Sequence, residues 1–142
     1  MVSQLSIFIK NASGTLERVL QLFKEGSIQI ITTTLADTQD FGILRVICSE
    51  PQRAFLVLKD AGITVTLTQV EAIELDNTPG QAADALRAFA VDDVEIRYLY
   101  SFLLKNKGIL IFKTDKAGLA DKIIKDNNFH ALNDVDLIKL TE

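Results

Sequence analysis

Two short turns contain the residues of this sequence with the clearest chemical potential. The first is Asn11-Ala12-Ser13-Gly14-Thr15-Leu16, and the second is Asn77-Thr78-Pro79-Gly80-Gln81-Ala82. Each turn follows an apolar run with strand-like alternation and precedes a run with helical spacing. A glycine turn at a helix N-terminus presents unpaired backbone N–H groups, and the helix dipole favours negative charge there. Both turns are therefore candidate sites for a small anion or a carboxylate.

The two turns belong to an internal repeat of 66 residues. Shifting the sequence against itself by 66 positions gives 72 aligned pairs without a gap, of which twelve are identical. About five identities are expected by chance from average residue frequencies. The identical pairs fall on turn and apolar-periodic positions, as in the pairing of Gly14 with Gly80. The sequence therefore predicts two copies of one unit, with domains at 1–69 and 70–142.

Hydrophobic periodicity predicts the same order of elements in both units. Alternating apolar residues predict strands, and apolar residues three and four positions apart predict helices. In the first unit the expected elements are a strand at 5–9, a helix at 16–23, strands at 28–35 and 43–48, a helix at 54–61 and a strand at 63–68. In the second unit they are a strand at 70–75, a helix at 82–89, strands at 94–104 and 109–113, a helix at 119–124 and a strand at 129–132. The sequence DLIKL at 136–140 is expected to extend this last strand or to add an edge strand.

The order βαββαβ, present twice, predicts an α+β fold of two ferredoxin-like units. Each unit is expected to be an antiparallel sheet with two helices on one face. A unit of about 70 residues buries only a small core, and its open sheet face or edge is prone to further pairing. We therefore expect the two units, and two chains of a homodimer, to pack side by side.

The amino-acid composition argues against nucleic-acid-binding, disulfide-rich and membrane proteins. The 142 residues are 48% hydrophobic and 24% charged, as in ordinary globular proteins. The net charge of −4 provides no basic field for nucleic acid or for an anionic membrane. The single cysteine, Cys48, excludes an intrachain disulfide and fits a reducing compartment. With no signal peptide and no run of transmembrane length, we expect a cytoplasmic protein without membrane partners.

A family resemblance follows from the turns and the strands after them. The segments Asn11-Ala12-Ser13-Gly14 and Asn77-Thr78-Pro79-Gly80 are followed, after a helix, by Gly26-Ser27-Ile28-Gln29-Ile30 and Asp92-Asp93-Val94-Glu95-Ile96. An Asn-x-Pro-Gly turn and a Gly-Ile-Asn-Ile-like strand within βαββαβ resemble the ACT domain. The tandem arrangement is similar to that of small stand-alone bacterial proteins made of two ACT domains, and the resemblance covers nearly the whole chain.

The resemblance implies a regulatory protein that binds a free amino acid at an interface between ACT domains. In the serine-feedback version of the family, ligand contacts come from the turn asparagine and from a polar residue fifteen positions after the turn glycine. The candidate ligand-binding residues are accordingly Asn11, Ala12, Ser13, Gly14, Thr15, Leu16, Gln29, Ile30, Asn77, Thr78, Pro79, Gly80, Gln81, Ala82, Glu95 and Ile96. The resemblance names no regulated enzyme or other protein target.

This chain departs from the family pattern at two positions. Ser13 replaces the usual proline of the first turn, and the acidic Glu95 stands where an amide is expected. The backbone N–H groups of 13–16 and 79–82, apart from the proline, could bind the carboxylate of an amino acid. Strand carbonyls, an Asn oxygen or Glu95 could bind its ammonium group. The alternative is that both glycines only form a strand-to-helix turn with a local Asn cap.

Other function classes are less well supported by the sequence. An enzyme would need a nucleophile–base pair, a metal cluster or a phosphate loop, and the sequence indicates none of these, nor a cofactor. An RNA-recognition motif shares the βαββαβ order, but Gly42–Ile47 and Gly108–Lys113 lack its aromatic and basic pattern. The remaining alternative is a ligand-free dimerisation or assembly module that modulates a partner protein.

Overall fold

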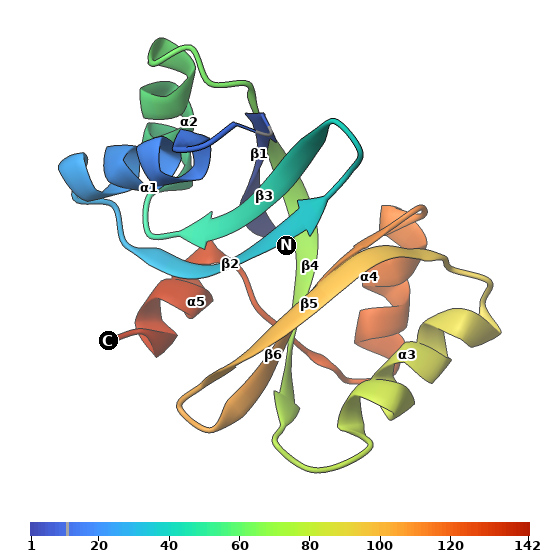
Figure 1. The fold of residues 1–142 in the computed structure, drawn as a ribbon. Helices are drawn as coiled ribbons and strands as arrows, with labels where there is room; N and C mark the ends of the chain where they lie inside the picture. The colour runs from blue at the N-terminus through green and yellow to red at the C-terminus, as the bar shows by residue number, and fades with distance from the viewer. Residues whose placement is uncertain (11) are drawn as a thin grey trace. The chain divides into compact units, whose positions relative to one another are not determined.

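The computed structural model describes residues 1–10 and 12–142, which divide into two compact units (Figure 1). The first unit comprises Ser3–Gln69, and the second comprises Val70–Glu142 with Met1–Val2. Within the described ranges, no helix is long and apolar enough to cross a membrane. The elements in chain order are β1 (Val2–Lys10), α1 (Thr15–Glu25), β2 (Ile30–Asp37), β3 (Phe41–Cys48), α2 (Pro51–Asp60), β4 (Val65–Asp76), α3 (Gln81–Val91), β5 (Ile96–Leu104), β6 (Lys107–Thr114), α4 (Ala117–Asp126), β7 (His130–Ala131) and α5 (Asp134–Leu140).

The first unit has the predicted βαββαβ order. Its strands lie in the order β2-β3-β1, with the beginning of β4 next to β1. The β1–β3 and β2–β3 pairs are antiparallel, with Lys10 opposite Phe41 at one end and Ile30 opposite Cys48 at the other. The helices α1 and α2 contact each other and contribute to one apolar core with the sheet. Its buried residues are Leu5, Ile7, Ile9, Val19, Phe23, Ile28, Leu44, Val46, Cys48, Ala54 and Leu58.

The second unit repeats this arrangement with its own core. The strand order is β5-β6-β4-β7, and all three pairings are antiparallel. Asp76 lies opposite Lys107 at one end of the sheet, and Ile96 lies opposite Thr114 at the other. The buried core residues are Ile73, Ala85, Phe89, Val94, Leu110, Phe112, Ala120, Ile123 and Ile124. The predicted fold class, two ferredoxin-like units with antiparallel sheets and helices, is therefore confirmed.

The C-terminal segment differs from the prediction. Residues 134–140 form α5, so the expectation that DLIKL at 136–140 would extend or add a strand is wrong. Asn133 starts α5 as its N-cap: its side chain accepts a hydrogen bond from the Asp136 amide at 2.9 Å, while Asp136 Oδ2 accepts one from the Asn133 amide at 3.0 Å. This reciprocal capping box satisfies two N–H groups at the helix start. The buried Leu137 then anchors the short helix.

Candidate functional site

The first glycine turn connects β1 to α1 as a tight β-turn. Gly14 has φ +85° and ψ −7°, and the Thr15 amide donates to the Ala12 carbonyl at 3.3 Å. These values are those of a type II turn with glycine at its third position. The Ala12 amide donates to Lys10 O at 2.7 Å, and the Gly14 carbonyl accepts the first helical hydrogen bond, from the Arg18 amide at 3.0 Å. The turn therefore passes directly into the first turn of α1.

The second glycine turn has the same geometry 66 residues later. Gly80 has φ +88° and ψ −8°, and the Gln81 amide donates to Thr78 O at 3.4 Å. The Thr78 amide donates to Asp76 O at 2.8 Å, and the Asp84 amide donates to Gly80 O at 3.0 Å. The internal repeat that the sequence indicates is thus reproduced in the backbone hydrogen bonds of the two turns.

The turn residues themselves differ between the copies. Ser13 and Pro79 occupy the second position of the β-turn, where proline is favoured but not required. Asn77 donates a side-chain hydrogen bond to Asn106 Oδ1 at 3.3 Å, so its amide is already engaged within the second unit. Asn11, its predicted counterpart at the ligand, lies outside the described residues.

Both glycines open onto empty space. A Cβ atom built at Gly14 or at Gly80 would meet no described heavy atom within 4 Å, so the glycines are required by their positive φ and not by close packing. Among the described residues, no side chain caps the N-terminus of α1 or α3. The helices α2 and α4 also lack such a cap in the part of the chain that is described. The left-handed glycine with open space in front of it is what distinguishes α1 and α3.

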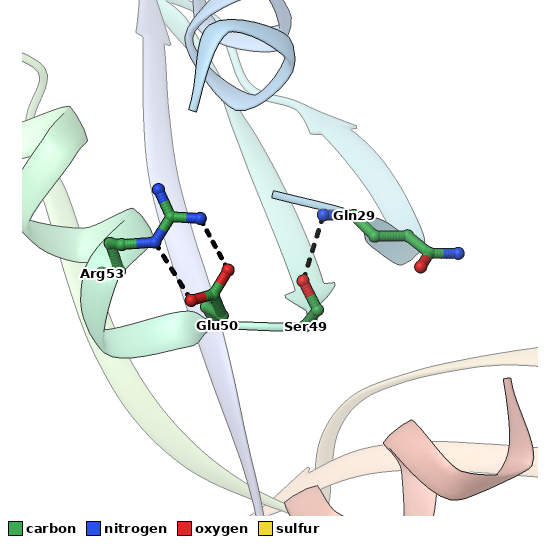
Figure 2. Close-up of polar contacts among 4 residues, drawn as sticks. All are labelled: Gln29, Ser49, Glu50 and Arg53. Carbon is green, nitrogen blue, oxygen red and sulfur yellow. Dashed lines mark hydrogen bonds and ion pairs between the residues drawn. The ribbon is translucent and has the colours of Figure 1, made fainter. Parts of the chain in front are cut away.

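The second-strand residues Gln29 and Glu95 occupy equivalent positions just before β2 and β5. The Gln29 amide donates to Ser49 Oγ at 3.1 Å, and the Ser49 amide donates to Gln29 O at 2.9 Å. Figure 2 shows the Gln29 side chain extending away from the Glu50–Arg53 pair. The Glu95 amide likewise donates to Asp115 Oδ1 at 2.9 Å. Both side chains are exposed, so their terminal groups are accessible to a ligand.

The charges around these strand starts differ. Near Gln29, the guanidinium of Arg53 pairs with Glu50 at 2.6 Å, and its hydrogen bond lowers the pKa of the Glu50 carboxyl (Figure 2). Glu95 instead lies 3.7 Å from Arg97, in an exposed pair. Exposed pairs contribute little stability, so Glu95 is not held by that contact. Ile30 and Ile96, which follow in the chain, are partly buried and pack against the cores.

The register separates each turn from the strand start of the same unit. In the first unit, β1 ends beside Phe41, whereas β2 begins beside Cys48, at the other end of β3. In the second unit, Lys107 and Thr114 mark the same two ends of β6. Seven residue steps along a strand span about 23 Å. The turn and the strand start of one unit therefore lie at opposite ends of its sheet and cannot contact one ligand together.

Two hollows of the second unit adjoin the start of α3. The smaller, of about 290 Å³, contains four residues of the predicted turn, Asn77, Thr78, Gln81 and Ala82. Its other lining residues are mainly apolar: Leu75, Asp76, Ser101, Phe102, Leu103, Gly108, Ile109 and Leu110. The larger, of about 430 Å³, is lined by Glu74, Leu75, Asp76, Gln81, Asp84, Ala85, Lys107, Asn127, Asn128, Phe129 and His130. Neither of these two hollows is lined by Glu95 or Ile96.

The larger hollow has polar walls that sequence reasoning missed. Lys107 Nζ lies 2.8 Å from Asp76 Oδ1, and this contact lowers the pKa of the Asp76 carboxyl. His130 Nδ1 lies 3.4 Å from Glu74 Oε2. These groups come from β4, β6 and β7, and they meet because Asp76 pairs with Lys107 and Glu74 with His130 across the sheet. Among the described residues, no three His, Cys, Asp or Glu side chains are placed to hold a metal ion.

Comparison with known proteins places the chain in a family. Residues 1–141 match the family described as "ACT domain pair", so the chain belongs to that family. The crystal structure of protein BT0572 from Bacteroides thetaiotaomicron has a TM-score of 0.90 and 33% sequence identity, covering 96% of this chain and 94% of that chain. The sequence prediction of a tandem ACT-domain protein is therefore confirmed. A comparison with functionally curated proteins gave no match.

The fold is also similar to that of regulatory subunits of aspartate kinase. The ligand-free subunit from Thermus thermophilus has a TM-score of 0.63 and 15% identity, covering 87% of this chain and 91% of that chain. The subunit from Thermus flavus has a TM-score of 0.59 and 16% identity, covering 87% and 90% of the two chains. At these identities the likeness concerns the fold alone.

Proposed function

We propose that this protein is a non-catalytic regulatory protein that binds a free amino acid at a glycine turn. The observation that carries this proposal is the recurrence of one turn geometry, with a left-handed glycine and open space, at the starts of α1 and α3. N–H groups of the first helical turn, near Leu16 or Ala82, would bind the ligand carboxylate, which the helix dipole also favours.

The ligand ammonium group would be bound by a strand start of a different unit. The turn and the strand start of one unit lie at opposite ends of its sheet, so the complementary group has to come from the other unit or from a second chain. Gln29 would offer an amide oxygen, and Glu95 would offer a carboxylate. We therefore propose a homodimer whose two kinds of site are not equivalent and need not both be occupied.

A thermal-shift measurement against each of the twenty amino acids tests this proposal. A ligand present at 100 times its Kd stabilises the folded protein by about 2.7 kcal/mol, which raises Tm by several degrees for a chain of this size. Stabilisation by one or a few amino acids, confirmed by calorimetric titration, is the expected result. If none of the twenty stabilises the protein at millimolar concentration, the assembly function described below is favoured instead.

The Gly80→Asp and Gly80→Asn variants separate charge from backbone strain. The two new side chains are nearly equal in size, but aspartate adds a negative charge where the ligand carboxylate would bind. We expect Gly80→Asp to weaken binding more than Gly80→Asn. Gly62→Asp is the matched control, since Gly62 has φ +79° and open space but does not start a helix. Equal affinity in all three variants and the wild type would place the site elsewhere.

A ligand-free assembly module is the second candidate function. The outermost strand β5 exposes Leu99 and Leu103, with 44% and 62% of their surface accessible. An edge strand with exposed apolar side chains favours pairing with another chain. Sedimentation at several protein concentrations would test this candidate: a dimer that forms equally with and without amino acids would support it.

A further inference from the structure

A carboxyl group is buried in the core of the second unit. Glu71 lies on β4 with only 4% of its surface accessible, and it pairs in register with the fully buried Phe112 of β6. Its Oε1 atom has no hydrogen-bond partner among the described residues. A buried carboxylate oxygen without a partner is costly, so the neutral acid is favoured at this position.

The internal repeat shows how unusual this position is. The counterpart of Glu71 is Leu5, and the counterpart of Asp121 on α4 is Phe55 on α2. Leu5 is fully buried in the first core, and Phe55 packs against that core. The second unit therefore has two carboxyl groups where the first unit has two apolar side chains.

The groups that face Glu71 come from three parts of the second unit. The Asp121 carboxyl on α4 lies within reach of a hydrogen bond to the Glu71 carboxyl, and its negative charge acts on the same group. The N-terminal ammonium and Lys113 of β6 are the nearby positive groups. Burial, followed by the hydrogen bond and charge of Asp121, raises the pKa of Glu71 to about 7, against the weaker opposing effect of the two cations.

We propose that a proton bound by Glu71 in the folded state bridges its carboxyl to the Asp121 carboxylate, and that loss of this proton as the pH rises loosens the packing of α4 on β4. With the proton bound, the Glu71 carboxyl donates to the Asp121 carboxylate, and the two groups together carry a single negative charge. Without it, the buried Glu71 carboxylate faces the half-buried Asp121 carboxylate. We expect α4, which carries Asp121, to shift more than β4, because β4 is held by its pairing with β6 and β7.

Movement of α4 would change the shape of the larger hollow of the second unit. The helix ends at Asp126, and the following residues Asn127, Asn128 and Phe129 line that hollow. The pair is thus a pH-sensitive device that acts on the wall of a hollow beside the Gly80 turn. The proposal does not require that an amino acid binds there.

Chemical denaturation of the full chain between pH 5 and pH 8 tests the pair. Because the pKa is raised in the folded state, the stabilisation is present below the unfolded pKa and is lost as the pH rises through the folded pKa. Values of 4.5 and about 7 correspond to a loss of roughly 70-fold in the folding equilibrium constant between pH 5 and pH 8. We expect Glu71→Gln to remove most of this loss.

Matched variants and a direct titration make the test decisive. Asp121→Asn should reduce the pH dependence, whereas Asp126→Asn, an exposed acid on the same helix, should leave it unchanged. Carboxyl ¹³C NMR of the wild type should show Glu71 titrating near pH 7, whether or not the variants fold. Titration of Glu71 near its ordinary value, or unchanged behaviour in Asp121→Asn, would overturn the proposal.

Discussion

The two units have nearly the same turns but different interiors. The φ angles of Gly14 and Gly80 are 85° and 88°, and the corresponding turn hydrogen bonds agree within 0.1 Å. By contrast, Leu5 of the first core corresponds to Glu71 of the second. A turn between a strand and a helix depends mainly on the glycine, so it tolerates changes around it. Which side chain is stable at a core position depends on all the side chains around it. Equivalent backbone positions can therefore hold an apolar residue in one unit and a titrating acid in the other.

Truncating equivalent core phenylalanines is expected to have the largest effect. Phe23→Ala and Phe89→Ala should each destabilise the protein by about 3–5 kcal/mol. Phe89→Ala should cost more, because its ring lies 5.1 Å from the Phe112 ring and 6.2 Å from the Phe129 ring. Each aromatic pair adds about 0.5–1.5 kcal/mol. Urea denaturation at pH 6 measures both variants, and equal costs would mean that the ring contacts add nothing.

Giving the second unit the apolar pair of the first should have the next largest effect. The double variant Glu71→Leu with Asp121→Phe is expected to be more stable than the wild type at pH 8 by about 1–4 kcal/mol, since apolar residues can replace buried polar pairs favourably. The gain should shrink toward pH 5, where Glu71 of the wild type is protonated. Denaturation midpoints at both pH values provide the measurement. An equal gain at both pH values would mean that packing, and not the protonation of Glu71, accounts for the difference in stability.

Exchanging the second residues of the two turns should have the smallest effect. Ser13→Pro is expected to stabilise the protein by about 0.4–1 kcal/mol, and Pro79→Ser to destabilise it by a similar amount, through the entropy of the unfolded chain. Calorimetric Tm values of the two variants measure this. Destabilisation by Ser13→Pro would indicate that the two turns are less alike than their Gly14 and Gly80 angles imply.

Most of the fold could be predicted from the sequence because it depends on local patterns. The strand and helix periods, the two glycines and the 66-residue offset were sufficient for two βαββαβ units. The segment DLIKL at 136–140 was wrongly predicted as a strand because its apolar residues also fit a strand, whereas the Asn133-x-x-Asp136 capping pattern starts a helix.

The candidate site could be predicted only in part. The turns were found because glycine at a strand-to-helix junction has a local cause. The separation of Gly80 from Glu95 depends instead on the register of the strands. The family pattern gives only the spacing of a turn and a strand residue along the sequence, and it carries no information on register. The burial of Glu71 was missed because an acid in an alternating strand is ordinarily exposed. Its alignment with Leu5 was the available signal.

Hydrogen exchange in the short helix α5 can report on local opening of the C-terminal segment. Seven residues make about two turns, too few for a helix to persist in water without support. Its attachment depends on the Asn133–Asp136 capping box and on Leu137. Its amide hydrogens should therefore exchange with deuterium through local opening, well before those of either core. Mass spectrometry of a C-terminal peptide would then register changes in the surroundings of α5 while both cores stay folded.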